Sequence, residues 1–540
     1  MPVGGKLPLA TISFAPLVVK SKDRREGKHS NYHGGQRSEA VESAQSLAAA
    51  FTPIQEVLFV AVVCMGQFMT QTNIGVCLSP LDIVGDSFGI TDPGILSWFM
   101  AGYSLTVGTF ILVSGRCGDL FGYRLMFISG FCWLSLWSLV AGLSVYSNHI
   151  LFIFARVLQG LGGAMLLPNA LALLGATYQP GKRKNMIFAI FGAAAPNSAL
   201  LGTVFGALFS QLAWWPWTYW SQALVSLACA ALGLMVIPSI HHNTHYEKSL
   251  LGLLKAIDAL GGTGGIGGLV LINIAWNQAP IAGWSEPYVY VILIIGILFI
   301  AAFFYVEFRV AEHPLIPFHA FSRDVSFVLG CVACGWGSFG IWVYYFWRFQ
   351  EKFRHATPLL ASAEFVPVGP MGIIACVVTG WLMGRMRPGW IMVLSMCAFT
   401  LGNVLIAIAP VHQTYWALTF VCLLVIPWGM DMSFPAASLM LSNSVERKHQ
   451  GVGASLVTTI VNYSVSLSLG FAGTVEVHVN NGGTTPADLL KGYRGALYVA
   501  IGLGGLGMFL SAIYTFKGYR AESLSEKIQT ERAGATEEAE

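Results

Sequence analysis

Long apolar segments, separated by short polar ones, follow one another along almost the whole chain. A run of about 18 mostly apolar residues is long enough to cross the hydrocarbon core of a bilayer as a helix. Only 11% of the residues are charged, whereas a soluble domain carries about 25% because its surface faces water. The charge is too scarce to coat a water-soluble globule, and we predict an all-α polytopic membrane protein.

Apolar runs bounded by charges, prolines or turn residues predict fourteen transmembrane helices. In order they are Val57–Ser79, Ile95–Ser114, Met126–Tyr146, Ile150–Thr177, Met186–Gln211, Trp217–Ile237, Ala256–Trp276, Tyr288–Tyr305, Ser326–Trp347, Leu359–Met383, Trp390–Ala409, Tyr415–Leu441, Val452–Val475 and Tyr493–Phe516. An even number of spans requires both termini to lie on the same side of the membrane.

The distribution of Lys and Arg predicts the orientation of these spans. Alternate loops carry Lys and Arg, and the intervening loops, such as Pro80–Gly94, carry none. Because basic loops stay in the cytoplasm, we expect both termini there. Two predicted outer loops depart from the pattern: one carries Arg348, Lys352 and Arg354, and the other carries Lys491.

The predicted cytoplasmic loop between spans 2 and 3 reads Gly-Arg-Cys-Gly-Asp-Leu-Phe-Gly-Tyr-Arg. Its glycines, including Gly115 and Gly122, allow a tight turn and close helix approach. Asp119 can engage basic groups, such as Arg116 and Arg124, or helix N-termini. These features indicate a gating loop, and the alternative is an ordinary charged turn.

Span 4 contains Arg156 with Gly160 and Gly163 on the same helical face. An arginine inside a membrane helix is costly, so it should face a cavity or a partner. The alternative is that Arg156 extends its side chain to the nearby outer interface.

Span 5 carries small residues at spacings of three and four: Gly192, Ala195, Ala199, Gly202 and Gly206. Such a stripe lets the backbones of two membrane helices approach closely. We expect it to pack against another helix.

These motifs resemble those of the major facilitator superfamily, whose signature loop and span-4 arginine motif they match in spacing. The chain departs from the family at Leu120, where an arginine is common, and in span 5, where the antiporter motif lacks its proline and last glycine. The resemblance implies a twelve-helix core plus two extra central helices, alternating access, and a role for Arg156 in handling substrate or protons.

The number of spans resembles the fourteen-span drug:proton antiporters. Within them, the segments MTQTNIGVCLSPLDIVGDSFG and WFMAGYSLTVGTFILVSGR resemble the fungal branch associated with aminotriazole and boron resistance, which also includes proteins linked to ammonium. We therefore expect a fungal transporter.

Asp431 is the strongest candidate for a coupling or binding group. It lies near the middle of span 12 between Pro427 and Pro435, and a carboxyl group at that depth indicates function by default. The alternative is that it caps backbone groups freed by the two prolines. Span 1, where many relatives place an acid, offers only a polar uncharged face.

The remaining candidates for the substrate and proton path are polar residues within spans. Glu364 lies near the outer end of span 10, where a solvated carboxylate is the alternative. The uncharged candidates are Gln67, Gln71, Asn73, Asn197 and Asn462. Each amide could instead bridge two helices.

Other classes of protein have little support in the sequence. The chain contains no GxxxxGK[ST] phosphate loop, GxSxG or HExxH motif, so we expect neither ATP-driven transport nor an enzyme. Most of the ten cysteines lie in apolar runs, and we expect no metal site and no cofactor. The net charge of +3 is scattered, so no nucleic-acid partner is expected.

We expect a cytoplasmic N-terminal arm without regular structure (1–55), a first six-helix half (56–240), a linker with two extra helices (241–310), a second half (311–516) and a similar tail (517–540). The predicted function is proton-coupled export of small toxic compounds or metabolites by a monomer in the lipid bilayer, at the plasma membrane rather than the vacuole. The alternatives are passage of a small polar solute such as ammonium or borate, and a transporter-like receptor.

Overall fold

The computed structural model describes residues 51–179, 181–238, 249–311, 314–316, 323–444 and 450–537. These residues form helices and connecting turns, without a strand among them. The predicted N-terminal arm lies almost entirely outside the described residues.

The helices form two bundles and a central pair. The first bundle comprises α2 (Pro53–Leu78), α3 (Leu81–Ser87), α4 (Pro93–Phe121), α5 (Tyr123–Leu143), a short 3-10 turn (Ser144–Tyr146), α6 (His149–Thr177), α7 (Lys182–Leu212) and α8 (Pro216–Val236). The central helices are the short α9 (Leu250–Ala256) and two long helices, α10 (Ala259–Ala282) and α11 (Pro287–Arg309). We call α10 and α11 the central pair, or extra pair. The second bundle comprises α12 (Arg323–Lys352), α13 (Pro358–Phe365), α14 (Val368–Met383), α15 (Pro388–Ala407), α16 (Leu418–Ser444), α17 (Gln450–Val479) and α18 (Pro486–Glu537).

Fourteen helical stretches in the described part of the chain are long and apolar enough to cross a membrane. This confirms the predicted number of spans. Their ends differ from the predicted ones by a few residues, most of all in α18, which begins at Pro486 and not at Tyr493. Proline favours the first helical position because its fixed φ suits a helix and its missing N–H would have no partner there.

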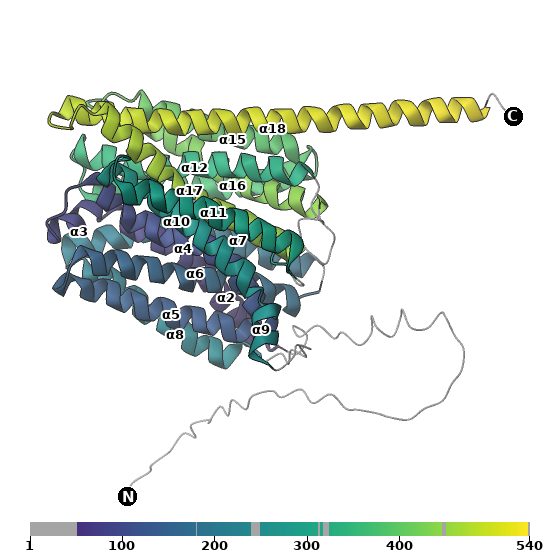
Figure 1. Ribbon diagram of the computed structural model, residues 1–540, viewed down its shortest axis with the longest axis horizontal. Helices are drawn as coiled ribbons and strands as arrows, with labels where there is room; N and C mark the ends of the chain where they lie inside the picture. The colour runs from purple at the N-terminus through teal and green to yellow at the C-terminus, as the bar shows by residue number, and fades with distance from the viewer. Residues whose placement is uncertain are drawn as a thin grey trace, which may run out of the picture.

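Helix α18 also continues past the predicted end of span 14, as far as Glu537. Figure 1 shows it projecting beyond the bundles. The segment 517–540 was predicted to lack regular structure, and that prediction is wrong up to Glu537. The segment contains no proline and is rich in Ala, Glu, Lys and Arg, which all favour a helix.

The two bundles lie side by side in Figure 1, the first in purple and blue and the second in green and yellow. They meet where α4 packs against α17 and where α7 packs against α13 and α14. We call these contacts the α4–α17 seam and the α7–α14 seam. The central pair lies over the first of them, because α10 packs against both α4 and α17.

Polar contacts join α10 to the α4–α17 seam. The Ser466 hydroxyl of α17 lies 2.9 Å from the carbonyl oxygen of Ala101 in α4 and 3.1 Å from Asn273 Oδ1 in α10. Asn277 donates to the Ser466 carbonyl over 3.3 Å, and the Tyr463 hydroxyl donates to the Leu269 carbonyl over 2.9 Å. One serine thus connects three helices, and the extra pair is fixed to both bundles.

The segment predicted to be a gating loop is mostly helical. Helix α4 continues to Phe121, so Gly115, Arg116 and Asp119 lie within its last two turns. The break is at Gly122, whose φ of 96° lies in the left-handed region that favours glycine. The predicted loop is therefore a single-residue turn, because Gly115 and Gly118 keep the helical conformation and the backbone turns only at Gly122.

Candidate transport site

Arg156 lies inside the first bundle and is fully buried, with 0% of its surface exposed. Its Nε donates to the Phe99 carbonyl of α4 over 3.0 Å. Its terminal nitrogens donate to the Asn73 carbonyl of α2 over 2.7 Å and to Gln159 Oε1 of α6 over 2.8 Å. A longer bond of 3.4 Å joins Arg156 to Asn73 Oδ1. The guanidinium group therefore ties together three helices.

Two tyrosine rings complete the surroundings of Arg156. Its guanidinium carbon lies 4.9 Å from the ring centre of Tyr103 and 5.8 Å from that of Tyr219, distances typical of cation–π contacts. Within the described residues no carboxylate pairs with it. Because the side chain is enclosed by protein, the alternative that it extends to the outer interface is wrong. The sequence did not indicate either tyrosine as its partner.

Asp431 lies near the middle of α16, and both flanking prolines are inside that helix. Pro435 has no N–H to donate to the Asp431 carbonyl, so the helix is locally weakened where the side chain emerges. The Cys376 side chain of α14 lies near the carboxylate and interacts with it electrostatically. The carboxylate oxygen Oδ2 is buried and has no hydrogen-bond partner among the described residues.

The unpartnered oxygen of Asp431 lies close to the first bundle. A Cβ built on Gly372 of α14 would be 2.8 Å from Asp431 Oδ2 and 3.2 Å from Pro196 Cβ of α7. Pro196 is inside α7, so the carbonyl of Gly192 lacks its helical donor. Asp431 therefore sits at the α7–α14 seam, where both bundles have an irregular helix.

The predicted polar residues do not form one cluster. Asn73 is fully buried beside Arg156, whereas Gln67 and Gln71 are half-buried elsewhere on α2. Asn197 lies at the α7–α14 seam, where its Oδ1 would be 3.4 Å from a Cβ on Gly369. Arg156 and Asp431 thus belong to different bundles, the first with Asn73 and the second with Asn197 nearby.

Glu364 and Asn462 lie apart from Asp431. The Glu364 carboxylate accepts a hydrogen bond from Gln350 of α12, at the predicted outer end of the second bundle. Asn462 donates to the Thr458 carbonyl of its own helix, α17, over 3.0 Å. No group of three His, Cys, Asp or Glu side chains in the described ranges is arranged to hold a metal ion.

At the predicted inner end, the basic residues of the signature motif bind the last turns of helices. Arg116 Nε donates to the Ala256 carbonyl at the end of α9 over 2.9 Å, and Arg124 donates to the Leu234 carbonyl in α8 over 2.7 Å. A helix C-terminus carries partial negative charge, which favours such cations. Asp119 accepts a hydrogen bond of 2.8 Å from the Tyr123 hydroxyl across the Gly122 turn. The motif therefore binds the first bundle to the central linker.

Another polar contact at the same end joins α2 to α7. Arg183 forms an ion pair with Glu56, and the Tyr178 hydroxyl donates to the same carboxylate over 3.2 Å. Burial, and next the nearby Glu56 carboxylate, raise the pKa of Tyr178 above its ordinary value. These residues all belong to the first bundle.

The glycines of the first bundle differ in their surroundings. A Cβ on Gly202 would lie 2.6 Å from the Thr72 carbonyl oxygen, and one on Gly206 would lie 2.9 Å from the Val76 carbonyl oxygen, both in α2. Gly163 and Gly160 face α4 just as closely, the former 2.8 Å from the Tyr103 hydroxyl. Gly192 is an exception: it is exposed, and a Cβ there would meet nothing within 4 Å. Its predicted packing role is wrong, because Pro196 lies inside α7 between Gly192 and the later members of the stripe, Ala199, Gly202 and Gly206, and a proline there bends a helix.

Comparison with known proteins decides the family. The family model described as Major Facilitator Superfamily matches residues 60–470. The chain belongs to the major facilitator superfamily. The match runs from α2 into α17, across the first bundle, the central pair and most of the second bundle, so the resemblance drawn from the motifs is confirmed. The fourteen helices form the major facilitator fold with two additional central helices.

Several curated relatives of this superfamily member are fungal. It is 53% identical to the low affinity ammonium transporter of Saccharomyces cerevisiae over 474 residues, 87% of this chain and 91% of the relative. It is 44% identical to the efflux pump terG of Aspergillus terreus over 495 residues, 91% of this chain and 93% of the relative. It is 38% identical to the aminotriazole resistance protein of S. cerevisiae over 488 residues, 87% of each chain.

A solved structure supports the same fold. The peptide transporter POT in complex with sulfate superposes with a TM-score of 0.60 at 15% identity, over 86% of this chain and 94% of that chain. At this identity the likeness concerns the fold alone.

The fungal relatives confirm the predicted drug-efflux branch of the superfamily.

Proposed function

We propose that the protein is a proton-coupled exporter of small toxic compounds or metabolites that works by alternating access. The two bundles rock about a site near the membrane midplane, as in other transporters built from repeated halves. In this proposal the halves comprise residues 56–240 and 311–516, and residues 241–310 form the linker with the extra pair.

The position of Asp431 is the observation that carries this proposal. A coupled transporter needs a group that can bind a proton and that each side of the membrane reaches in turn. Asp431 lies at a seam between the bundles, in mid-helix, with one oxygen buried and unpartnered within the described chain. Rocking the bundles changes the surroundings of this carboxyl group, so that its proton exchange becomes coupled to the transport cycle. Arg156 stabilises the first bundle. In this proposal it acts on the substrate indirectly, through its hydrogen bonds to Asn73 of α2.

The fungal relatives support export of toxic compounds. Two of them are named an efflux pump and an aminotriazole resistance protein. We therefore take aminotriazole as the first probe for this chain.

Transport by purified protein in proteoliposomes tests the proposal. An imposed pH gradient drives movement of labelled aminotriazole in the wild type, and Asp431→Asn abolishes that drive while the protein stays folded. Glu364→Gln is the matched control, because this carboxyl group lies at the predicted outer end and is bound by Gln350. Full pH-driven transport by Asp431→Asn would refute the coupling role.

Passage of a small polar solute is the second candidate function. The relative at 53% identity is named a low affinity ammonium transporter, and the polar face of α2 contains no acidic group near its middle. Labelled methylammonium distinguishes the two functions. Uptake of methylammonium without an imposed pH gradient, together with no movement of aminotriazole, supports this second function and contradicts the first.

For the cellular arrangement we propose a monomer in the plasma membrane with both termini in the cytoplasm. The basic residues of the α4–α5 turn and of the α7 N-terminus support this orientation through the positive-inside rule. Epitope tags at the two ends, read in intact and permeabilised cells, test it. Tags on opposite sides of the membrane would contradict the proposal.

A further inference from the structure

The two bundles carry opposite charges at the predicted outer end. The segment 80–94 of the first bundle contains three aspartates and neither Lys nor Arg. The end of α12 in the second bundle carries Arg348 and Lys352, which break the positive-inside pattern. Basic residues in an outer loop need a reason other than orientation, and the structure supplies one.

Both basic side chains bind Asp82 of α3. Arg348 forms an ion pair with Asp82 Oδ1, and Lys352 Nζ lies 3.1 Å from Asp82 Oδ2. The Arg348 side chain is 3% exposed and that of Asp82 is 18% exposed, so solvent screens the pair only weakly. Asp82 belongs to the first bundle and both cations to the second, so this contact holds the two bundles together.

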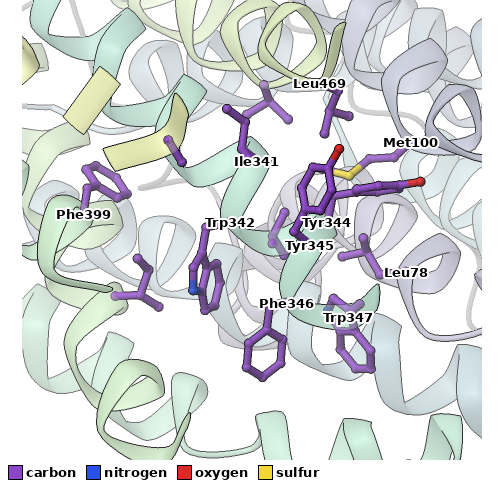
Figure 2. Packing of buried hydrophobic residues seen from close by; sticks show 14 of the residues in the cluster. Leu78, Met100, Ile341, Trp342, Tyr344, Tyr345, Phe346, Trp347, Phe399 and Leu469 are labelled. Atoms are coloured by element: carbon purple, nitrogen blue, oxygen red, sulfur yellow. The ribbon is translucent and has the colours of Figure 1, made fainter. Parts of the chain in front are cut away.

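Other contacts close the same end. The Tyr344 hydroxyl of α12 donates to the Pro93 carbonyl at the start of α4 over 3.1 Å. Beneath the ion pair lies a buried hydrophobic cluster with members from both bundles. Figure 2 shows Leu78 and Met100 of the first bundle among Tyr344, Tyr345 and Trp347 of the second. The predicted outer end is therefore closed in this structure, with the ion pair above an apolar plug.

Two further carboxyl groups face Arg348 from its own bundle. Glu351 lies one turn later on α12, and both of its oxygens are buried without a hydrogen-bond partner among the described residues. Glu476 of α17 is 3% exposed. Its Oε2 accepts a hydrogen bond of 2.6 Å from Tyr345, and its Oε1 has no partner within the described chain. Arg348 Nε is buried and unpartnered as well.

We infer that Arg348 exchanges partners during the transport cycle: it holds Asp82 while the outer end is closed and turns to Glu351 or Glu476 when that end opens. This inference rests on the proposed alternating-access function. When the first bundle moves away, Asp82 leaves with α3, and a buried guanidinium without a partner would be very costly. Glu351 and Glu476 move with Arg348 and have free oxygens to receive it. In the closed arrangement Arg348 and Lys352 bind Asp82 across the seam, and in the open one Arg348 binds a carboxyl group of its own bundle, which makes the outer end a two-state element.

The carboxyl groups therefore act as positioning residues with opposite effects. Removing the charge of Asp82 weakens the closed arrangement, and replacing the Glu351 and Glu476 carboxyl groups together by amides weakens the open one. If the cluster only stabilised the fold, amide exchange at the predicted outer end would become faster in both variants. Opposite changes in amide exchange therefore distinguish partner exchange from a purely structural role.

Hydrogen–deuterium exchange of the full-length protein in lipid nanodiscs measures whether the outer end opens more or less often in each variant. In Asp82→Asn, we expect amide exchange of segment 88–92 to rise on the order of tenfold, which is within the usual range of coupling between two states. In Glu351→Gln/Glu476→Gln, we expect it to fall below that of the wild type. Asp86→Asn is the matched control, because it removes the same charge from an exposed position on the same helix.

The outcomes separate this inference from the proposed function. Faster exchange in both variants, or no change in Asp82→Asn, overturns the partner exchange even if pH-driven transport is intact. The expected opposite shifts uphold it even if no pH-driven transport is found. If Asp82→Asn fails to fold, Lys352→Gln takes its place, since it removes one of the two contacts to Asp82 and predicts a smaller increase in exchange.

Discussion

The Asp431 carboxylate and Pro196 of the opposite bundle both lie next to the same glycine, Gly372. A methyl group on Gly372 would be 2.8 Å from Asp431 Oδ2 and 3.2 Å from Pro196 Cβ. A tight approach of this kind at a moving seam makes the glycine a sensitive position.

Gly372→Ala is expected to impair transport without unfolding the protein. The added methyl group must displace the Asp431 carboxylate or widen the seam, and inserting an atom into a packed site costs about 1–3 kcal/mol. We therefore expect the transport rate to fall about tenfold or more, at unchanged expression. Gly380→Ala on the same helix is the control, because a Cβ there meets nothing within 4 Å. Equal rates for the two variants would show that the seam tolerates the methyl group.

Arg156→Lys is expected to destabilise the first bundle. Lysine can neither span the acceptors on Phe99, Asn73 and Gln159 nor present a planar group to the tyrosine rings. Losing two or three buried hydrogen bonds of about 1–1.5 kcal/mol each lowers the free energy of unfolding by about 2–4 kcal/mol. Thermal unfolding of the detergent-purified protein measures this change, with Arg124→Lys as the control because Arg124 makes an exposed contact. A wild-type unfolding temperature for Arg156→Lys would contradict the structural role of the arginine.

The fourteen spans were predictable from the sequence because the requirement that creates them is local. Each apolar run must be long enough to cross the bilayer and must satisfy its own backbone hydrogen bonds, and no distant residue is needed to decide this. The same logic marked Asp431 and Arg156, since an ionisable group inside a span is costly wherever it occurs. The turn at Gly122 was also visible, although the helix before it extends further than expected.

Contacts between distant parts of the chain were not predictable. Arg348 and Asp82 are 266 positions apart, and nothing in the sequence around either residue indicates that they pair. The departure of Arg348 and Lys352 from the positive-inside pattern was nevertheless a signal, because an acidic segment without basic residues lies in another predicted outer loop. The wrong prediction of a packing role for Gly192 has a different cause. The spacing of small residues predicts one packed face only in a straight helix, and α7 contains Pro196.

Gly202→Ala is expected to lower the stability of the protein, whereas Gly192→Ala is not. A Cβ on Gly202 would lie 2.6 Å from the Thr72 carbonyl oxygen, which belongs to the backbone of α2 and cannot rotate away. The variant must push α2 and α7 apart, and we expect a lower unfolding temperature. Gly192 has free space around it, so alanine there should be neutral or stabilising by up to about 1 kcal/mol through its higher helix propensity. A drop of the same size in both variants would mean that glycine flexibility in α7, and not close packing, is what matters.

Ser466→Ala is expected to loosen the extra pair of helices from the α4–α17 seam. The substitution removes the hydroxyl that contacts Ala101 and Asn273 and adds no atom to the junction. Asn273 Oδ1 keeps the hydrogen bond from Asn277 Nδ2 over 3.0 Å, so the variant removes one buried contact and leaves no new polar atom of Asn273 unpaired. Losing one such hydrogen bond costs about 0.5–1.5 kcal/mol, and α10 should show faster amide exchange while α5 and α8 do not. Ser468→Ala is the control, because Ser468 bonds only within its own helix in the described structure. Unchanged exchange in α10 would show that apolar packing alone holds the extra pair, and that the serine junction contributes nothing to it.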